Sequence, residues 1–262
     1  VRNEEDIIRF TLRHMISEGV DGMIVADNMS SDKTRAILEE IKSQASIPIA
    51  IVDDREAGYY QSRKMTDLAH LAANKGAHYI IPFDADELWY GLEPGRVADI
   101  LRNSQTDVAK IRMWNHFATQ SDSADDNPFR RMEWRKKECS SFCKVAYRYQ
   151  PNLVIAQGNH DILDSAGETV TSNLIPVGIR HFPYRSAGHF IQKARIGGAA
   201  YAVTDLAPNQ GAHWKRYKRI LDSDGVKALE EIFYQEYFFS DPQLAGMVHD
   251  PAPFLRHQSV DR

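Results

Sequence analysis

The chain has 262 residues, of which 43% are hydrophobic and 26% are charged, and its formal net charge is −4 at pH 7. These values are ordinary for a globular protein with one large domain or two small ones. They exclude a disordered chain, a collagen or a coiled coil as a description of the whole. They also lack the basic excess of a nucleic-acid-binding protein, so we expect no nucleic-acid partner.

Cysteine content and hydropathy predict the cellular compartment of the protein. Cys139 and Cys143 are too few for a disulfide framework or a four-ligand zinc site, which favours a reducing compartment. We recognise neither a run of 18 apolar residues nor a secretory leader. We therefore expect a cytoplasmic protein whose contact with a membrane is at most peripheral, through the basic segment 213–219.

Three short apolar runs alternate with amphipathic segments in the first third of the chain. Each amphipathic segment precedes one run, and the segments lie near residues 7–16, 36–41 and 65–72. The apolar runs cover residues 22–26, 47–52 and 79–83. This alternation predicts a mostly parallel, Rossmann-like sheet flanked by helices, which is an α/β fold.

The rest of the chain mixes helix-like and strand-like segments, a pattern that predicts an α+β half with a helical C-terminus. We expect helices at 94–103, 190–203 and 226–239, and strands at 108–114, 142–149, 152–156 and 175–182. The polar stretch 119–127 is typical of a loop that closes over a ligand. We divide one continuous domain into a donor-binding half, 1–110, and an acceptor-side half, 111–262.

Carboxylates follow all three apolar runs. Asp27 ends the first, Asp53 and Asp54 follow the second, and Asp84 and Asp86 follow the third. Ligands of an open parallel sheet bind beyond the carboxyl ends of its strands, and clustered carboxylates suit Mg²⁺ or Mn²⁺. The spacing alone is uninformative, because a second Asp-x-Asp triplet begins at Asp222; a solvated acidic turn is the alternative.

Further candidates stand alone in the sequence. Arg63 opens the third amphipathic segment, where a cation either is solvated or faces an anion. His160 and Asp161 follow one predicted strand, and His181 ends another. For each histidine taken alone, a packed or surface role is the alternative reading.

Together these residues resemble a known family. The order Arg2-Asn3-Glu4-Glu5, then Asp27-Asn28-x-Ser30-Ser31-Asp32, then Phe83-Asp84-Ala85-Asp86-Glu87, is similar to family 2-type glycosyltransferases of the GT-A fold, in particular the bacterial family 2-like group. The later Gly158-Asn159-His160 and the segment from His181 to Ser186 also resemble that group.

The resemblance implies a nucleotide-sugar donor and a bound Mn²⁺ or Mg²⁺. Asp84 and Asp86 match the motif for the metal and the diphosphate, and His181 matches a histidine that completes the metal shell. The remaining donor contacts that it implies are Arg2, Asn3, Glu4, Asp27 at the nucleobase, and Arg63. The family also has an apolar strand directly before the Arg-Asn-Glu motif. This sequence has only Val1 there, so we expect that an upstream strand is missing from it.

The resemblance also implies an inverting transfer to a hydroxyl acceptor, which would be a glycan, a lipid-linked molecule or a small molecule. Asp161 is our first candidate for the catalytic base and His160 is the second. One alternative is a non-catalytic, degenerate module that binds a carbohydrate or a partner through aromatics such as Trp89 and Trp114. A less favoured alternative is a haloacid-dehalogenase-type phosphatase in which Asp84 would be the nucleophile.

Overall fold

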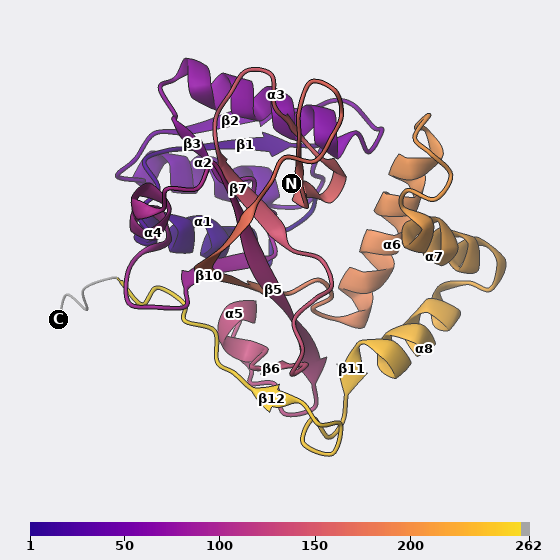
Figure 1. Cartoon of the computed structure of the whole chain (residues 1–262). Helices are drawn as coiled ribbons and strands as arrows, with labels where there is room; N and C mark the ends of the chain where they lie inside the picture. The colour runs from indigo at the N-terminus through magenta and orange to yellow at the C-terminus, as the bar shows by residue number, and fades with distance from the viewer. Residues whose placement is uncertain (258–262) are drawn as a thin grey trace.

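The computed structural model describes residues 1–257, and it has an α/β architecture as predicted. Figure 1 shows the first helices and strands gathered on one side and the last three helices on the other. The helices are α1 (Ile8–Ser17), α2 (Thr34–Gln44), α3 (Gln61–Asn74), α4 (Val97–Asn103), α5 (Pro128–Arg131), α6 (Ala187–Ala202), α7 (Ala212–Ser223) and α8 (Val226–Glu236), with a 3-10 turn, η1 (Gln157–Asn159).

The first two apolar runs form a parallel pair, as predicted. β1 (Met23–Asp27) and β2 (Ile49–Asp53) pair in parallel, with Asp27 opposite Asp53. Val1 lies along β1: its amine donates to the Ala26 carbonyl at 2.6 Å, and the Asn28 N–H donates to the Val1 carbonyl at 2.8 Å. That pattern is a parallel bridge, so the Arg-Asn-Glu motif starts at the end of the sheet where β1 delivers Asp27.

The third apolar run differs from the prediction of a strand over 79–83. Only Tyr79–Ile80 forms a strand, β3, and it pairs antiparallel with β7 (Lys144–Arg148). Pro82 has no N–H to give to a ladder, and residues 81–84 continue as irregular chain toward the acid motif. The predicted strand is therefore wrong for residues 81–83.

A larger mixed sheet is built around β5 (Val108–Thr119), which is longer than predicted. β10 (Asn173–His181) runs parallel to β5, and β4 (Glu87–Gly91) runs antiparallel to β10. The sequence analysis missed β4, because a strand buried along its whole length shows no alternation of polar and apolar residues. Short strands complete the structure: β6 (Trp134–Arg135), β8 (Val154–Ile155), β9 (Ile162–Leu163), β11 (Phe238–Phe239) and β12 (Val248–His249).

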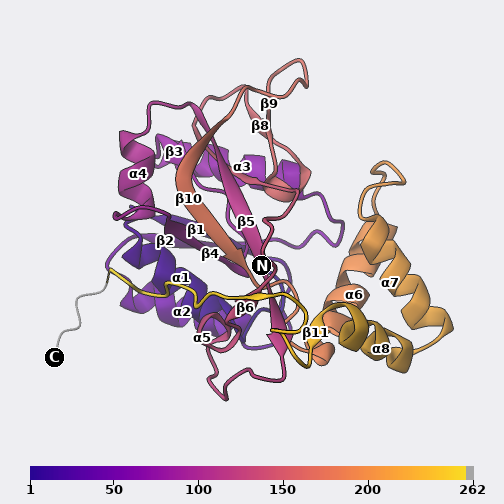
Figure 2. The same cartoon turned by 60° about the horizontal axis from the view of Figure 1, so that its bottom comes forward.

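The C-terminal part consists of α6, α7 and α8, packed on one another, and a returning segment. We call residues 248–257 the C-terminal strap. Phe254 packs against Phe10 and Phe129, and Arg256 donates to the Gly91 carbonyl at 2.9 Å. Figure 2 shows this yellow segment running from the C-terminal helices across the N-terminal half. Along residues 1–257, none of the helices combines the length and the apolar character needed to cross a bilayer.

Candidate active site

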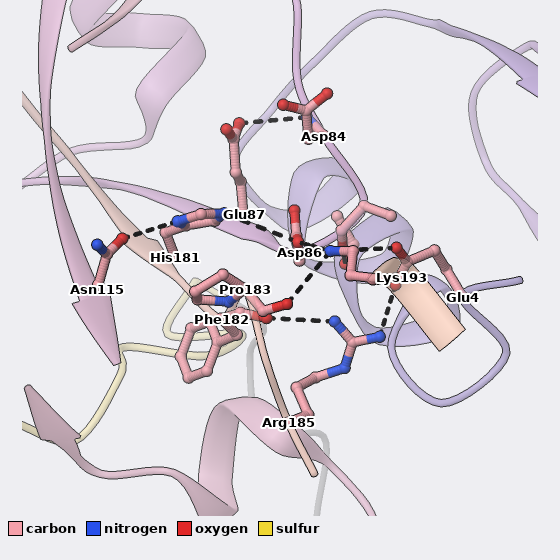
Figure 3. A network of polar contacts seen from close by, with 12 residues as sticks. Glu4, Asp84, Asp86, Glu87, Asn115, His181, Phe182, Pro183, Arg185 and Lys193 are labelled. Carbon is pink, nitrogen blue, oxygen red and sulfur yellow. Dashed lines mark hydrogen bonds and ion pairs between the residues drawn. The ribbon is translucent and has the colours of Figure 1, made fainter. Parts of the chain in front are cut away.

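Strand pairing brings the acid motif to His181. β4 starts at Glu87, directly after Asp86, and its antiparallel register on β10 sets Glu87 opposite His181. The Phe182 N–H donates to the Asp86 carbonyl at 2.9 Å and fixes the turn beside the strand. β10 in turn lies beside β5, with His181 opposite Asn115. Figure 3 shows these side chains converging.

The Asp86 carboxylate and the His181 ring face one another. His181 Nε2 is 3.7 Å from Asp86 Oδ2, while His181 Nδ1 is 2.8 Å from Asn115 Oδ1. Since the amide oxygen can only accept, Nδ1 carries the proton and Nε2 presents a lone pair toward the carboxylate. Burial opposes ionisation of Asp86, but the Lys193 ammonium holds its pKa well below the ordinary value of 3.8. An ionised carboxylate and the Nε2 of His181 thus face the same point.

This pair fits a divalent cation that also binds substrate. Mg²⁺ in phosphate sites commonly takes one or two protein ligands and completes its shell with phosphate oxygens and water. Asp86 and His181 supply two ligand atoms, and Asn115 holds the imidazole as a metal-bound histidine is usually held. Within residues 1–257, no three histidine, cysteine or carboxylate side chains come together as a metal-binding group. A cation here would therefore complete its shell with water and with oxygens from the substrate.

Asp84 has a different environment. Its Oδ2 is 2.5 Å from Lys144 Nζ, and its Oδ1 accepts from the side-chain amides of Gln61 at 3.2 Å and Asn159 at 3.4 Å. Lys144 also lies 2.9 Å from Glu87. Burial disfavours the Lys144 ammonium, but the two carboxylates raise its pKa. Three donors already hold Asp84, and its predicted role as a metal ligand stays a prediction.

The Arg-Asn-Glu motif is tied to the loop after β1. Asn3 adopts a positive φ of 55°, its N–H donates to Ser30 Oγ at 3.1 Å, and its side-chain oxygen accepts from the Ser31 N–H at 2.8 Å. The Glu4 N–H donates to Thr34 Oγ1 at 2.8 Å, which turns the Glu4 carboxylate toward Arg185. Two segments that the sequence analysis named separately thus form one wall.

A cavity of about 1890 Å³ extends along β1 and α3, past the strand ends, to the C-terminal helices. Most of the predicted site residues line it: Arg2, Asn3, Glu4, Asp84, Asp86, His160 and His181. Asp27, Arg63 and Asp161 are not among its lining residues. The cavity contains more of the predicted donor and metal residues than of the predicted catalytic ones.

Asp27 and Arg63 are held outside the cavity by other partners. Asp27 is buried and accepts from the Ser30 N–H at 3.2 Å, as a turn residue does. Arg63 is 57% exposed and pairs with Glu56 at 2.6 Å. In their places, Asp54 and Lys64 reach the cavity wall and pair with each other at 2.7 Å.

His160 and Asp161 point to different surroundings. His160 lines the cavity, its Nδ1 lies 2.8 Å from the Cys143 carbonyl, and its ring stacks on Phe142. Burial lowers the pKa of His160 below 6.5, so the imidazole is neutral near pH 7 with a lone pair on Nε2. Asp161 instead pairs with Lys110 at 3.2 Å.

Four site residues were not found from the sequence. Lys144, Lys193 and Asn115 lie in a strand, a helix and a strand whose local patterns carry no functional signal. Arg185 belongs to a motif that the sequence analysis quoted without a role. Trp89, offered as a sugar-binding aromatic under the alternative reading, is fully buried in the core and unavailable to a ligand.

Comparison with known proteins then settles the family. A model of glycosyl transferase family 2 matches residues 1–153, more than half of the chain, including Asp84 and Asp86. The chain belongs to glycosyl transferase family 2. This family membership makes it a glycosyltransferase of the GT-A type and displaces the phosphatase alternative.

Among curated proteins, no match was found. Similar solved structures include S. aureus TarS 1–349 in complex with UDP, at 11% identity and a TM-score of 0.39, covering 85% of this chain and 70% of that one. TarS 1–349 by itself matches at 12% identity with a TM-score of 0.35 and the same coverage. A longer TarS structure matches at 10% identity and 0.36, covering 85% and 42%. We derive no residue roles from likenesses this distant.

Proposed function

We propose that this transferase moves a sugar from a nucleotide-sugar donor to a hydroxyl acceptor, with Mn²⁺ or Mg²⁺ bound and with inversion at the anomeric carbon. The observation that carries the proposal is the convergence of Asp86 and His181, 3.7 Å apart, in the wall of the large cavity. When bound, the divalent cation supplies neutralisation of charge on the leaving nucleoside diphosphate. The residues that would hold it are Asp86 and His181, with Asp84 as the third predicted ligand.

The donor-side residues fall into two groups. Arg2 and Lys64 are the cations of the wall nearest the end of β1, and Arg2 also donates to Asn28 at 3.3 Å. Asp54 is the carboxylate of that wall, and we propose it, rather than Asp27, as the acceptor for a nucleobase N–H. The predicted roles of Asp27 and Arg63 would require their side chains to leave the partners described above.

The first test is thermal unfolding with a panel of nucleoside diphosphates and nucleotide sugars, each with Mn²⁺ and with EDTA. A ligand at 100 times its dissociation constant stabilises the folded state by about 2.7 kcal/mol. We expect one nucleobase to raise the melting temperature in Mn²⁺ and to lose most of that effect in EDTA. Equal shifts with and without the metal would contradict metal dependence, and no shift with any nucleotide would contradict donor binding.

For the base, the geometry favours His160 over Asp161. His160 Nε2 would accept the proton of the acceptor hydroxyl as that oxygen forms its bond to the anomeric carbon. The bond from the same carbon to the diphosphate oxygen breaks, and the electron pair leaves with the nucleoside diphosphate. Asp161 lies outside the cavity wall and is neutralised by Lys110.

Replacing His160 by glutamine is expected to lower transfer by about 10²- to 10⁴-fold with little change in donor affinity, because general-base catalysis has that magnitude. Asp161→Asn is the matched control and should retain most of the activity. Since burial lowers the pKa of His160 below 6.5, wild-type transfer should persist as the pH falls to 6.5 and decline only below it, when Nε2 gains a proton. Loss of activity in Asp161→Asn alone would reverse the assignment.

A further inference from the structure

Lys193 reaches the acid motif from the C-terminal half of the chain. It lies on α6, and Figure 3 shows its side chain between Asp86 and Glu4. Its Nζ is 2.5 Å from Asp86 Oδ2, 3.3 Å from the Pro183 carbonyl and 3.5 Å from Glu4 Oε1. The side chain is 23% exposed and lines the cavity. No sequence motif pointed to this residue.

The ammonium and a divalent cation would need the same atom. Asp86 Oδ2 is the oxygen that faces His181 Nε2 at 3.7 Å, and it is also the oxygen that accepts from Lys193. A lysine ammonium and a divalent cation repel each other strongly at such short range. We propose that Lys193 is the resident counter-cation of this site, which holds Asp86 while no metal is bound and is displaced from it when a divalent cation binds.

Glu4 provides the place to which the ammonium moves. Arg185 Nη2 donates to Glu4 Oε2 at 2.5 Å, whereas Glu4 Oε1 is 3.5 Å from Lys193 Nζ. A short shift of a flexible lysine head therefore exchanges one carboxylate for another without exposing a buried charge. Lys193 acts as a positioning residue. The inference rests on the proposed metal-dependent function. It adds that Lys193 competes with the metal for Asp86, which the function alone does not require.

The main test is Mn²⁺ binding by the full chain without any donor, followed by the paramagnetic resonance signal of free Mn²⁺. Lys193→Met keeps most of the side chain and removes the charge, so we expect about tenfold tighter Mn²⁺ binding, or about 1.4 kcal/mol. Lys193→Arg should stay within threefold of wild type. Lys218→Met removes a lysine that pairs with Asp222 on α7 and should change nothing. Unchanged or weaker binding in Lys193→Met would overturn the proposal.

A second measurement uses only the wild-type protein, in case Lys193→Met does not fold. Reductive methylation of lysines, followed by mass spectrometry, reports how accessible each ammonium is. Because Mn²⁺ would take Asp86 from Lys193 and leave Glu4 as its carboxylate partner, we expect the metal to speed methylation of Lys193 severalfold. Lys218, which pairs with Asp222 on α7, should react at the same rate with and without Mn²⁺. Methylation of Lys193 that is equal or slower in Mn²⁺ would overturn the proposal.

The two proposals fail in different ways. Tighter Mn²⁺ binding by Lys193→Met without sugar transfer from any donor would leave Lys193 as the competitor and remove the proposed function. Mn²⁺-dependent sugar transfer by the wild type, together with unchanged Mn²⁺ binding in Lys193→Met, would keep the proposed function and remove Lys193 as the competitor.

Discussion

Replacing Asp86 by asparagine is expected to reduce sugar transfer by about a hundredfold to a thousandfold, the range that follows loss of a group that stabilises charge in a transition state. Asparagine keeps the size of the side chain but removes the negative charge that faces His181 and Lys193. A bound cation would then keep only His181, the predicted ligand Asp84 and substrate oxygens. The measurement is release of nucleoside diphosphate with the donor identified by the stability panel.

The matched control for that variant is Asp224→Asn, which alters the chain's other Asp-x-Asp triplet. Asp224 follows the end of α7, away from the residues that line the cavity. It should transfer sugar at the wild-type rate. If Asp86→Asn and Asp224→Asn had similar activities, the acid motif would not be part of the active site.

The second large effect concerns stability. Arg185 is 1% exposed, and its guanidinium contacts Glu4 at 2.5 Å and Asp6 at 2.6 Å. Arg185→Met leaves the buried Glu4 carboxylate with less compensation, and breaking a buried ion pair by removing one partner costs about 3–5 kcal/mol. We expect the free energy of unfolding, measured in urea, to fall by that amount.

The same pair predicts how stability depends on pH. Burial opposes ionisation of Glu4, but Lys193 and Arg185 together lower its pKa below the ordinary value of 4.5. A lowered folded-state pKa stabilises the protein at pH above the unfolded value, and that contribution is lost as the pH falls through the folded value. Wild type should therefore lose stability below about pH 4.5 more steeply than Arg185→Met does.

A surface pair provides the control for Arg185. Arg9 contacts Glu40 at 2.5 Å with partly exposed side chains, so Arg9→Met should cost less than about 1 kcal/mol. Comparable losses in Arg9→Met and Arg185→Met would mean that burial of the Glu4–Arg185 pair has no special weight.

The sequence predicted the parts of the fold that depend on local pattern. The first two apolar runs, β5, β7, β10, α6 and α8 appear close to where periodicity indicated. α7 was not predicted as a helix, because its basic residues 213–219 drew notice only for their charge. The strand expected at 79–83 ends at Ile80, two residues before Pro82. β4 was not predicted, because its residues do not alternate between polar and apolar.

The candidate site was predictable where it follows strand ends, as at Asp84 and Asp86. Its other half depends on pairing between distant segments. Glu87 meets His181 only because β4 and β10 are neighbours, and Asn115 orients that histidine only because β5 is next in the sheet. Such pairings between distant segments cannot be predicted from the local sequence. Lys193 and Asn115 were therefore identified only in the structure. The order of Asp161 and His160 as candidates for the base stays a prediction.

The C-terminal strap has a consequence for how the chain folds during synthesis. Leu255 donates from its backbone to a ring nitrogen of His14, across 241 positions, and Phe254 covers the same helix. During synthesis this face of α1 stays open to solvent until residues 248–257 have been made. Closing so long a loop is slow, because the chain loses conformational entropy before the stabilising contacts form. Until the strap arrives, the nascent first half therefore exposes apolar surface that the folded protein covers.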